Sequence, residues 1–343
     1  MYDVTIRGAG IFGLSIAWEC VKRGAKVQII DPHGVGAGAS GGIVGALAPH
    51  VPENWNAKKE LQFQSLIKAE RFWNEVEENA QMTSGYMRTG RLQPIADEHA
   101  LMLAKVRNCN AKELWKGLAS FEVVSDAPTW APPSPTGHWI YDSLSAHIHP
   151  YTACHALKRA LETQGVTFHA ESEAQGMTLW ATGVHDLLRI SQAFERPVGN
   201  GVKGQAALFD FDKAGCAQIF ADSLHFVPHK DGSLAVGSTS ERDYTDPVAT
   251  DDVLLSVINR AIAVFPELAY AKILKTWAGV RPRAKSRAPV LGRHPLDDSA
   301  YIANGGFKIG FGIAPAVATI MADFMLEGKE TIPDDFSVDS CLL

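Results

Sequence analysis

The apolar positions near the start of the chain predict a strand, a helix and a second strand. Residues 4–6 and 27–30 are short, largely apolar runs typical of buried strands, and apolar residues recur at helical spacing between them. Gly24 then provides a helix stop. We therefore expect a βαβ unit at the N-terminus. The apolar face of its helix is formed by Leu14, Ala17, Trp18 and Val21.

Three glycines lie in the turn between the first strand and this helix. Gly8 permits a tight turn, Gly10 lets the backbone approach a pyrophosphate, and Gly13 lets the helix pack close to the strand. Asp31 ends the second strand near the spacing of about 20 residues at which a carboxylate meets the adenosine ribose, and it disfavours NADP. A glycine turn in an ordinary α/β protein is the alternative. The agreement of strands, helix and acid favours dinucleotide binding.

Residues 34–48 are rich in glycine, alanine and serine. A flexible linker is one interpretation, but Ile43, Val44 and Leu47 interrupt the run and are suited to anchor it against a core. A longer cofactor laid over this segment would need small side chains and free backbone N–H groups, whereas a nicotinamide enzyme has no evident need for them. The composition therefore favours the longer cofactor.

A second glycine-lined helix start is predicted near the C-terminus. Residues 301–303 have the pattern of a strand, a glycine-rich turn follows, and the next helix has Pro315 in its first turn and Gly328 just past its end. Residues 178–183 predict another short strand, preceded by a helix that Gly165 ends. The second helix N-terminus could hold another electron-rich part of the same ligand.

The composition fits a globular chain of about two domains. The chain has 343 residues, 46% of them hydrophobic, and a formal net charge of −6. No stretch resembles a membrane span, and the N-terminus enters the first strand directly, which leaves no room for a secretory signal. We therefore expect a cytoplasmic protein. The acidic balance weighs against nucleic acid as a partner.

Cysteine and histidine spacing gives no metal signature. The five cysteines are scattered without a CxxC pair, which argues against a disulfide framework and a zinc site. His147 and His149 lack a third ligand at recognisable spacing, so we interpret them as part of a loop and expect no metal. We interpret Trp180 and Trp277 as packing residues.

Eight motifs along the chain resemble the D-amino acid oxidase family of FAD-dependent amine oxidoreductases, and within it the glycine oxidases. The similarity runs from residue 3 to about residue 328. The motifs, in order, are GAGIFG, IIDP, GASGGIVGALAP, WATG, VKGQ, FVPHKDGSLAVGST, WAGVRPRAKSRAPVLGRHP and NGGFKIGFGIAPAVA.

The resemblance implies an α/β fold with a Rossmann-like FAD-binding domain and a substrate domain built on a mixed antiparallel β-sheet. It assigns residues 1–85, 147–204 and 281–343 to the FAD-binding domain, and residues 86–146 and 205–280 to the substrate domain. The pattern around Lys230-Asp231-Gly232 independently predicts a β-hairpin in the latter.

The resemblance also names residues for the active site. Arg281 corresponds to the arginine that binds the substrate carboxylate, a role that a guanidinium fork suits. His225 stands where glycine oxidase has a tyrosine over the substrate, and Lys308 where it has a second arginine. Ser240 replaces an apolar pocket residue, so we expect a polar pocket. FAD contacts are implied for Gly8, Gly10, Ile11, Phe12, Gly13, Asp31, Pro32, Ala39, Ser40, Val44, Gly45, Ala46, Gly183, Gly306, Ile309, Gly310, Phe311, Gly312 and Ile313.

The implied reaction is oxidation of a small amino acid or secondary amine to its imine, by hydride transfer from Cα to flavin N5. Oxygen or another acceptor would take the electrons. No cysteine falls near the WAGVRPRAK motif in sequence, so we expect noncovalent FAD. A homo-oligomer is compatible with the sequence. Two alternatives stay open: an FAD oxidase that modifies the wobble uridine of tRNA at its carboxymethylaminomethyl group, and a flavin-dependent structural or sensor protein.

Overall fold

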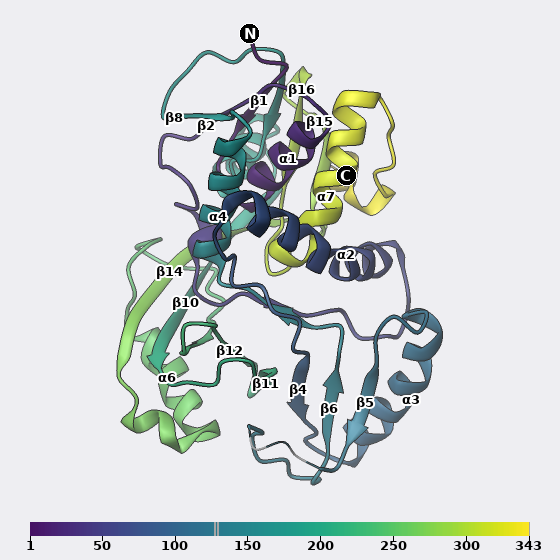
Figure 1. Cartoon of the computed structure of the whole chain (residues 1–343), viewed down its shortest axis with the longest axis vertical. Helices are drawn as coiled ribbons and strands as arrows, with labels where there is room; N and C mark the ends of the chain where they lie inside the picture. The colour runs from purple at the N-terminus through teal and green to yellow at the C-terminus, as the bar shows by residue number, and fades with distance from the viewer. Residues whose placement is uncertain (127, 129, 343) are drawn as a thin grey trace.

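The computed structural model describes residues 1–126, 128 and 130–342, which form two halves around two large sheets. Figure 1 shows a six-stranded sheet with α1, α4 and α7 in the upper part, and an eight-stranded sheet flanked by α3 and α6 in the lower part. The helices are α1 (Ile11–Lys22), α2 (Ala57–Ala80), α3 (Glu98–Leu114), α4 (Pro150–Thr163), α5 (Val184–Ala193), α6 (Val253–Val264), α7 (Gly310–Glu327) and α8 (Asp339–Leu342), with 3₁₀ turns η1 (Ala39–Gly41), η2 (Pro266–Tyr270) and η3 (Asp334–Phe336).

The six-stranded sheet confirms the predicted βαβ unit and the short strand predicted around residues 178–183. Its order is β15-β16-β9-β1-β2-β8, and every neighbouring pair is parallel except β15 with β16. α1 joins β1 to β2, and β1 lies inside the sheet with its apolar side chains fully buried. The strands are β1 (Val4–Arg7), β2 (Val27–Ile30), β8 (Thr167–His169), β9 (Met177–Trp180), β15 (Val290–His294) and β16 (Asp297–Asn304).

The eight-stranded sheet confirms the mixed, mainly antiparallel architecture. Its order is β14-β10-β13-β12-β11-β4-β6-β5, and only β11 with β4 pairs in parallel. A two-stranded ribbon of β3 (Ala46–Leu47) and β7 (Ala146–His147) lies apart from both sheets. The strands of the large sheet are β4 (Arg91–Pro94), β5 (Phe121–Val124), β6 (Trp139–Asp142), β10 (Gly199–Asp210), β11 (Gln218–Ala221), β12 (Leu224–Pro228), β13 (Ser233–Gly237) and β14 (Ile273–Ala284).

The predicted hairpin is the β12–β13 pair, and its turn closes with a hydrogen bond from the Gly232 N–H to the His229 carbonyl. The long strands β10 and β14 run through the positions 204/205 and 280/281 that we proposed as domain boundaries. The backbone hydrogen bonds between β10 and β14 therefore join the two halves of the molecule. The proposed division therefore falls inside continuous sheet structure.

α7 is the core helix of the upper half. It packs against α1 and α2, and Gly328 ends it in a left-handed conformation, as expected. The expectation for Pro315 was wrong, because the helix begins at Gly310 and the proline lies beyond its first turn. By length and composition α7 could cross a membrane, with a mean hydropathy of 1.3 over 18 residues, but 61% of that stretch is buried inside the protein.

Candidate active site

Backbone contacts explain two of the three glycines in the first turn. A Cβ at Gly8 would lie 2.4 Å from the Ala181 carbonyl oxygen, and one at Gly13 would lie 2.0 Å from the Gly8 carbonyl oxygen. Gly10 precedes α1, which has no side-chain cap, and the Ile11 N–H donates to the Ser40 hydroxyl at 3.0 Å. The uncapped first turn of α1 leaves N–H donors for an anion. This turn fits the pyrophosphate of FAD.

Asp31 has a structural role that the spacing did not predict. Its Oδ2 accepts a hydrogen bond from the Ala9 N–H at 2.7 Å, and its Oδ1 accepts one from the His33 N–H at 2.9 Å. The carboxylate at the end of β2, followed by Pro32, thus holds the glycine turn in place. A contact with the ribose stays a prediction.

The glycine-rich segment is anchored between the two halves. Ala39 and Ser40 begin η1 beside α1, and a Cβ at Gly45 would lie 1.9 Å from the Ile148 carbonyl oxygen. Val44 reaches the large sheet, where its Cγ2 lies 3.1 Å from the Cβ position of Gly237. Because Ile43 and Leu47 are fully buried and Ala46 belongs to β3, this segment is fixed against the core.

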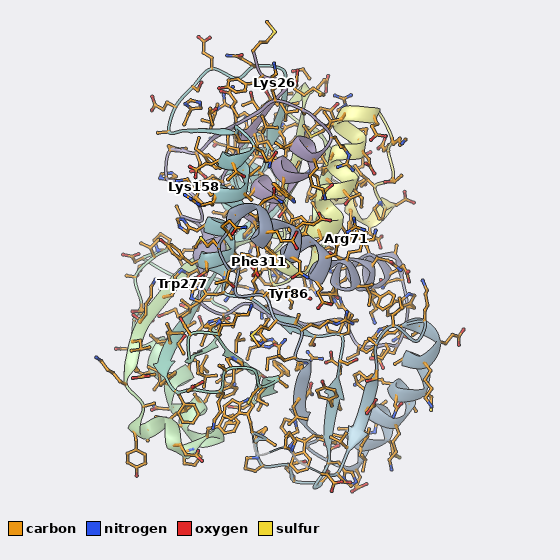
Figure 2. The ribbon with its side chains drawn as sticks, viewed as in Figure 1. Lys26, Arg71, Tyr86, Lys158, Trp277 and Phe311 are labelled. Carbon is orange, nitrogen blue, oxygen red and sulfur yellow. The ribbon has the colours of Figure 1, made fainter. Side chains whose placement is uncertain are left out.

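The second glycine turn meets the first. A Cβ at Gly306 would lie 3.0 Å from the Phe12 ring, and the Cβ position of Gly310 lies 3.7 Å from Ile11. α7 also begins without a side-chain cap, at Ile309. The N-termini of α1 and α7 therefore lie together. Phe311, Gly312 and Ile313 continue this first turn of α7, and Figure 2 places Phe311 at the waist of the molecule near Tyr86 and Trp277.

Gly183 joins the same region through a hydrogen bond, because its carbonyl accepts from the Asn304 amide at 2.8 Å. The residues predicted to bind the cofactor thus come from separate segments that converge around two uncapped helix N-termini. Small residues and unused backbone donors suit a long, electron-rich cofactor such as FAD. Which of these residues contact FAD stays a prediction.

Arg281 extends from β14 across Gly204, where a Cβ would lie 1.8 Å from its Nη2. Its Nη2 donates to the Ser238 hydroxyl at 2.5 Å and its Nη1 to the Thr239 carbonyl at 3.2 Å. Among the described residues no carboxylate forms a salt bridge with it. Burial lowers the pKa of Arg281 to about 10, while the charge of Glu241 acts in the opposite direction. The guanidinium therefore stays charged at neutral pH.

A buried polar network fixes the segment that accepts from Arg281. Lys203 is 1% exposed, and its Nζ lies 2.9 Å from Asp251 Oδ2. The Gln205 amide donates to Asp251 Oδ1 at 2.7 Å, and its backbone N–H donates to the Thr239 hydroxyl at 2.8 Å. Thr239 in turn donates to Glu241. This role of the lysine and glutamine of the VKGQ motif was not predicted from the sequence, where the available signal was two polar side chains in a buried strand.

Lys308 lies within electrostatic reach of both His225 and Arg281. Burial, together with the charges of Arg91 and Lys308, lowers the pKa of His225 to about 3. Burial, Arg281 and Arg283 lower the pKa of Lys308. His225 is therefore a neutral hydrogen-bonding group at ordinary pH. Its ring lies 4.7 Å from the Phe220 ring, centroid to centroid.

Ser240 is exposed, and the hydroxyl that Arg281 contacts belongs to Ser238. Ser238 directly follows the last residue of β13, whereas Ser240 lies two residues further along the chain. Trp180 packs against Arg7 and Arg189, whose guanidinium carbons lie 5.0 and 4.4 Å from its ring centroid. Trp277 packs against Gly42, where a Cβ would lie 3.5 Å from the ring.

The two histidines of the SAHIHP segment have different environments. His147 lies in β7 and is fully buried, while His149 precedes α4 and accepts a hydrogen bond from the Thr152 N–H. Within residues 1–126, 128 and 130–342, no three or more His, Cys, Asp and Glu side chains are arranged to hold a metal ion. Cys341 lies close in space to the WAGVRPRAKS segment, with its Sγ 3.0 Å from the Ser286 hydroxyl, which the linear sequence did not indicate.

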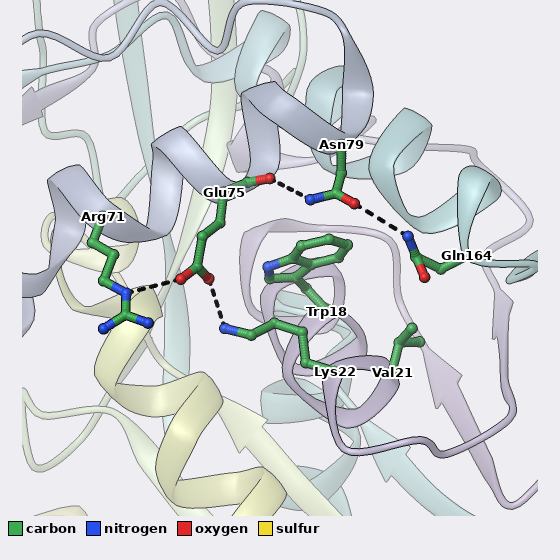
Figure 3. Close-up of a pocket in the computed structure, with 7 residues that line it drawn as sticks. All are labelled: Trp18, Val21, Lys22, Arg71, Glu75, Asn79 and Gln164. Atoms are coloured by element: carbon green, nitrogen blue, oxygen red, sulfur yellow. Dashed lines mark hydrogen bonds and ion pairs between the residues drawn. The ribbon is translucent and has the colours of Figure 1, made fainter.

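Two surface cavities lie away from this site. Figure 3 shows one of about 300 Å³ between α1 and α2, where Glu75 pairs with Arg71 and Lys22, and Asn79 bonds to Gln164. Most of its charged and amide groups are paired with one another. The other, of about 310 Å³, is lined by four cations near the end of β14: Arg242, Arg283, Lys285 and Arg287.

The parallel sheet and the paired helix N-termini are typical of a dinucleotide-binding protein. Residues 3–324 match the family described as FAD dependent oxidoreductase (DAO), and the chain belongs to this family. It is 24% identical to the glycine oxidase of Bacillus subtilis (strain 168), over 97% of this chain and 95% of that protein.

Solved structures show the same fold at lower identity. The structure of glycine oxidase from Bacillus cereus ATCC 14579 has a TM-score of 0.80 and 20% identity, covering 96% of each chain. The structure of iminodiacetate oxidase from Chelativorans sp. BNC1 has a TM-score of 0.83 and 21% identity, covering 97% of this chain and 98% of that one. These comparisons support FAD-dependent oxidation of an amine or amino acid, and they do not favour the tRNA-modifying alternative.

Proposed function

We propose that this protein oxidises a small amino acid or secondary amine to its imine, with Arg281 binding the substrate carboxylate. The observation that carries the proposal is a buried guanidinium whose partners are a hydroxyl and a carbonyl, without a salt bridge to an acid among the described residues. A substrate carboxylate would supply the missing charge in the bidentate geometry that arginine favours.

FAD, when bound, would supply the two-electron acceptor for this oxidation. The substrate would lose a hydride from Cα and a proton from its nitrogen as the C=N bond forms, and water would then hydrolyse the imine to a carbonyl compound. The protein's own residues position the substrate, and positioning supplies most of the rate enhancement in such a reaction.

The charge distribution around the site favours the reactive form of the substrate. Oxidation requires a neutral amine, and the nearby charges of Arg281 and Lys308 lower the pKa of an ammonium group held beside them. His225, which is neutral, can hydrogen-bond the substrate without adding a further charge. We assign positioning of the substrate to His225 and Lys308 on this basis.

Several finer properties are also proposals. Noncovalent FAD is supported by the environment of Cys341, which is 1% exposed within an apolar cluster. Cytoplasmic location, oxygen as acceptor and a possible homo-oligomer follow from the sequence argument. The assignment of residues 1–85, 147–204 and 281–343 to the FAD-binding domain rests on the family resemblance. The acidic net charge argues against nucleic acid as a partner. Acid precipitation that releases intact FAD would support noncovalent binding.

The test of the main proposal is Arg281→Met in the FAD-loaded enzyme. We expect kcat/KM for amino acids to fall by about 2–5 kcal/mol in transition-state stabilisation, with the flavin absorbance spectrum unchanged. Arg107→Met is the matched control, because Arg107 already has a bidentate carboxylate partner in Glu53, at 2.8 Å for both contacts, away from the site. An equal loss for an amine that lacks a carboxylate would show that Arg281 serves folding or the flavin instead.

A further inference from the structure

One face of the eight-stranded sheet carries a row of functional side chains. Directly paired residues of neighbouring strands point to the same face. The register pairs Arg91 with Gln218, Phe220 with His225, and His225 with Gly237. Because Gln218 and Phe220 are two residues apart on β11, Arg91 and His225 share one face.

The same face continues to Arg281. Gly237 pairs with Ala206, and Ala206 pairs with Trp277. Trp277 and Arg281 are four residues apart on β14, so their side chains leave the strand on the same side. The opposite face packs onto α6 through a separate apolar cluster that includes Phe226 and Val236. The row therefore faces the upper half, where the cofactor-binding residues lie.

Between Arg281 and His225, the same face of the sheet carries only small residues. Gly204, Ala206 and Gly237 lie on β10 and β13, between Arg281 on β14 and His225 on β12. Arg281 lies over Gly204, and Val44 lies over Gly237, where its Cγ2 is 3.1 Å from the Cβ position. Neighbouring strands lie about 4.8 Å apart, so β4 is displaced from β14 by about 24 Å along the sheet. A ligand reaching from Arg281 towards Arg91 must be longer than glycine.

The Arg91 side chain is held by an ion pair, and some of its N–H donors have no partner among the described residues. It is 9% exposed, and its Nε lies 3.0 Å from Oδ2 of Asp142, which is fully buried. Asp142 is itself held, because its Oδ1 accepts from the Ser145 N–H at 2.8 Å. Among the described residues, hydrogen bonds of the Arg91 side chain are confined to Nε. Both Nη groups are left to donate.

Buried polar atoms without partners gather around Arg91. Within the described part of the chain they include Oγ1 of Thr89, Oγ of Ser145, Oε1 of Gln218 and Nδ1 of His225. Gln218 pairs with Arg91 in the sheet register, Thr89 lies two residues before it, and His225 lies within reach of its charge. Buried polar groups are normally paired, so this set marks a place where a polar ligand or water completes the bonding.

We propose that Arg91 binds a second carboxylate, so that the substrates are amino acids or N-substituted glycines with an extended second carboxylate. This inference rests on the proposed function, in which Arg281 holds the carboxylate next to the reacting carbon. Asp142 positions Arg91, and His225 lies between the two arginines as a neutral hydrogen-bonding group. Lys308 adds positive potential without serving as the anchor.

The test compares acids with their amides in the FAD-loaded enzyme. Racemic aspartate, glutamate and 2-aminoadipate are assayed beside asparagine and glutamine, with glycine as the short reference. The variant is Arg91→Met combined with Asp142→Asn, because Arg91→Met alone would leave a buried carboxylate unpaired. Arg91→Lys keeps the charge but loses the fork, and Arg107→Met is the matched control.

We expect wild-type kcat/KM to be at least about tenfold higher for the best dicarboxylate than for its amide. The double variant should lower kcat/KM for the dicarboxylate about a hundredfold and change that for the amide by less than about threefold. Arg91→Lys should give an intermediate loss. Equal losses for acid and amide, or equal use of both by the wild type, would overturn the inference and leave amine oxidation intact.

A binding measurement separates this inference from the reaction itself. Glutarate and adipate, which carry no amine, are titrated into the holoenzyme while flavin absorbance is followed. We expect binding that the double variant weakens at least about tenfold and Arg107→Met does not. If no amino acid is oxidised but this difference persists, the proposed function fails and the Arg91 site stands. If glutarate and adipate bind the wild type and the double variant equally, the Arg91 site is refuted.

Discussion

The candidate cofactor site in the upper half is formed mainly by backbone groups, whereas the candidate substrate site in the lower half is formed by charged and polar side chains. In the upper half, glycine is needed at positions 8 and 13 because a Cβ would strike the backbone carbonyl of Ala181 or of Gly8. In the lower half, Arg91, His225 and Arg281 come from separate strands and share one face of the sheet through its register. A cofactor site of the first kind depends on backbone geometry, whereas a substrate site of the second kind depends on side-chain charge.

This contrast has consequences that can be measured. A site made of backbone donors should be sensitive to steric change and nearly indifferent to pH and salt. A site made of converging cations and buried neutral histidines should respond to charge, because burial and repulsion shift its pKa values and screening alters its attraction for anions.

The largest expected effect comes from Gly13→Ala. Its Cβ would lie 2.0 Å from the Gly8 carbonyl oxygen, and backbone cannot yield as a flexible side chain can. We expect a loss of more than about 3 kcal/mol in the free energy of unfolding, with loss of FAD, measured by denaturant titration and flavin content. Gly38→Ala is the control, because nothing lies within 4 Å of its Cβ position and its φ is −88°. Equal stability of the two variants would contradict the backbone interpretation.

The same contrast explains what could be predicted from sequence. The βαβ unit, the second glycine-lined helix start and the β12–β13 hairpin all depend on neighbours in sequence, and the structure confirms them. The position of Pro315 was wrong because glycines before a helix do not mark its first hydrogen-bonded turn. The second role of Asp31, as acceptor from the Ala9 N–H, needed the three-dimensional turn.

The candidate substrate site was harder to predict, because register is a property of pairs of strands. Arg281 was identified from its motif, but its acceptors Ser238 and Thr239 became visible only when β13 and β14 were placed on either side of β10. Arg91 carried no motif signal. Its significance depends on Asp142 and on strands that lie far along the chain.

Acid should destabilise the protein through buried histidines near the lower site. Burial lowers the pKa of His147 and of His229 to about 4. Between pH 6.5 and about 4 the unfolded chain therefore binds protons that the folded chain does not, so the free energy of unfolding falls as pH falls through this window. Each pKa unit corresponds to about 1.4 kcal/mol, which makes several kcal/mol available in total.

The histidine prediction is tested by thermal unfolding of the FAD-saturated protein at pH 7 and pH 4.5. His147→Leu should flatten the pH dependence, because a leucine removes one buried titrating group. His99→Leu, at an exposed position on α3, should leave the wild-type profile. An identical pH profile for His147→Leu and the wild type would show that carboxylates alone carry the acid sensitivity.

Lys203→Met tests whether the buried network holds Arg281 in place. Methionine fills the space of the lysine stem but loses the 2.9 Å contact with Asp251, which is exposed enough to stay solvated. We expect a fall of about tenfold in kcat/KM for amino acids, with the free energy of unfolding little changed. Lys230→Met, in the exposed hairpin turn, is the control. A large loss of stability without a change in kcat/KM would assign Lys203 to folding alone.

The smallest effect should be the dependence of substrate capture on salt. Arg242, Arg283, Lys285 and Arg287 line one cavity, none of them forms a salt bridge within the described residues, and the chain as a whole has a formal net charge of −6. A positively charged cavity on an acidic protein attracts anions to its vicinity, and salt screens this attraction. We expect kcat/KM for a dicarboxylate to fall about threefold between low and physiological ionic strength, and for a zwitterionic amino acid to change less. Arg242→Gln with Arg287→Gln should reduce this slope, whereas Arg159→Gln on α4 should not. A slope that is the same for both substrates, or unaltered in the double variant, would show that these cations do not steer the substrate.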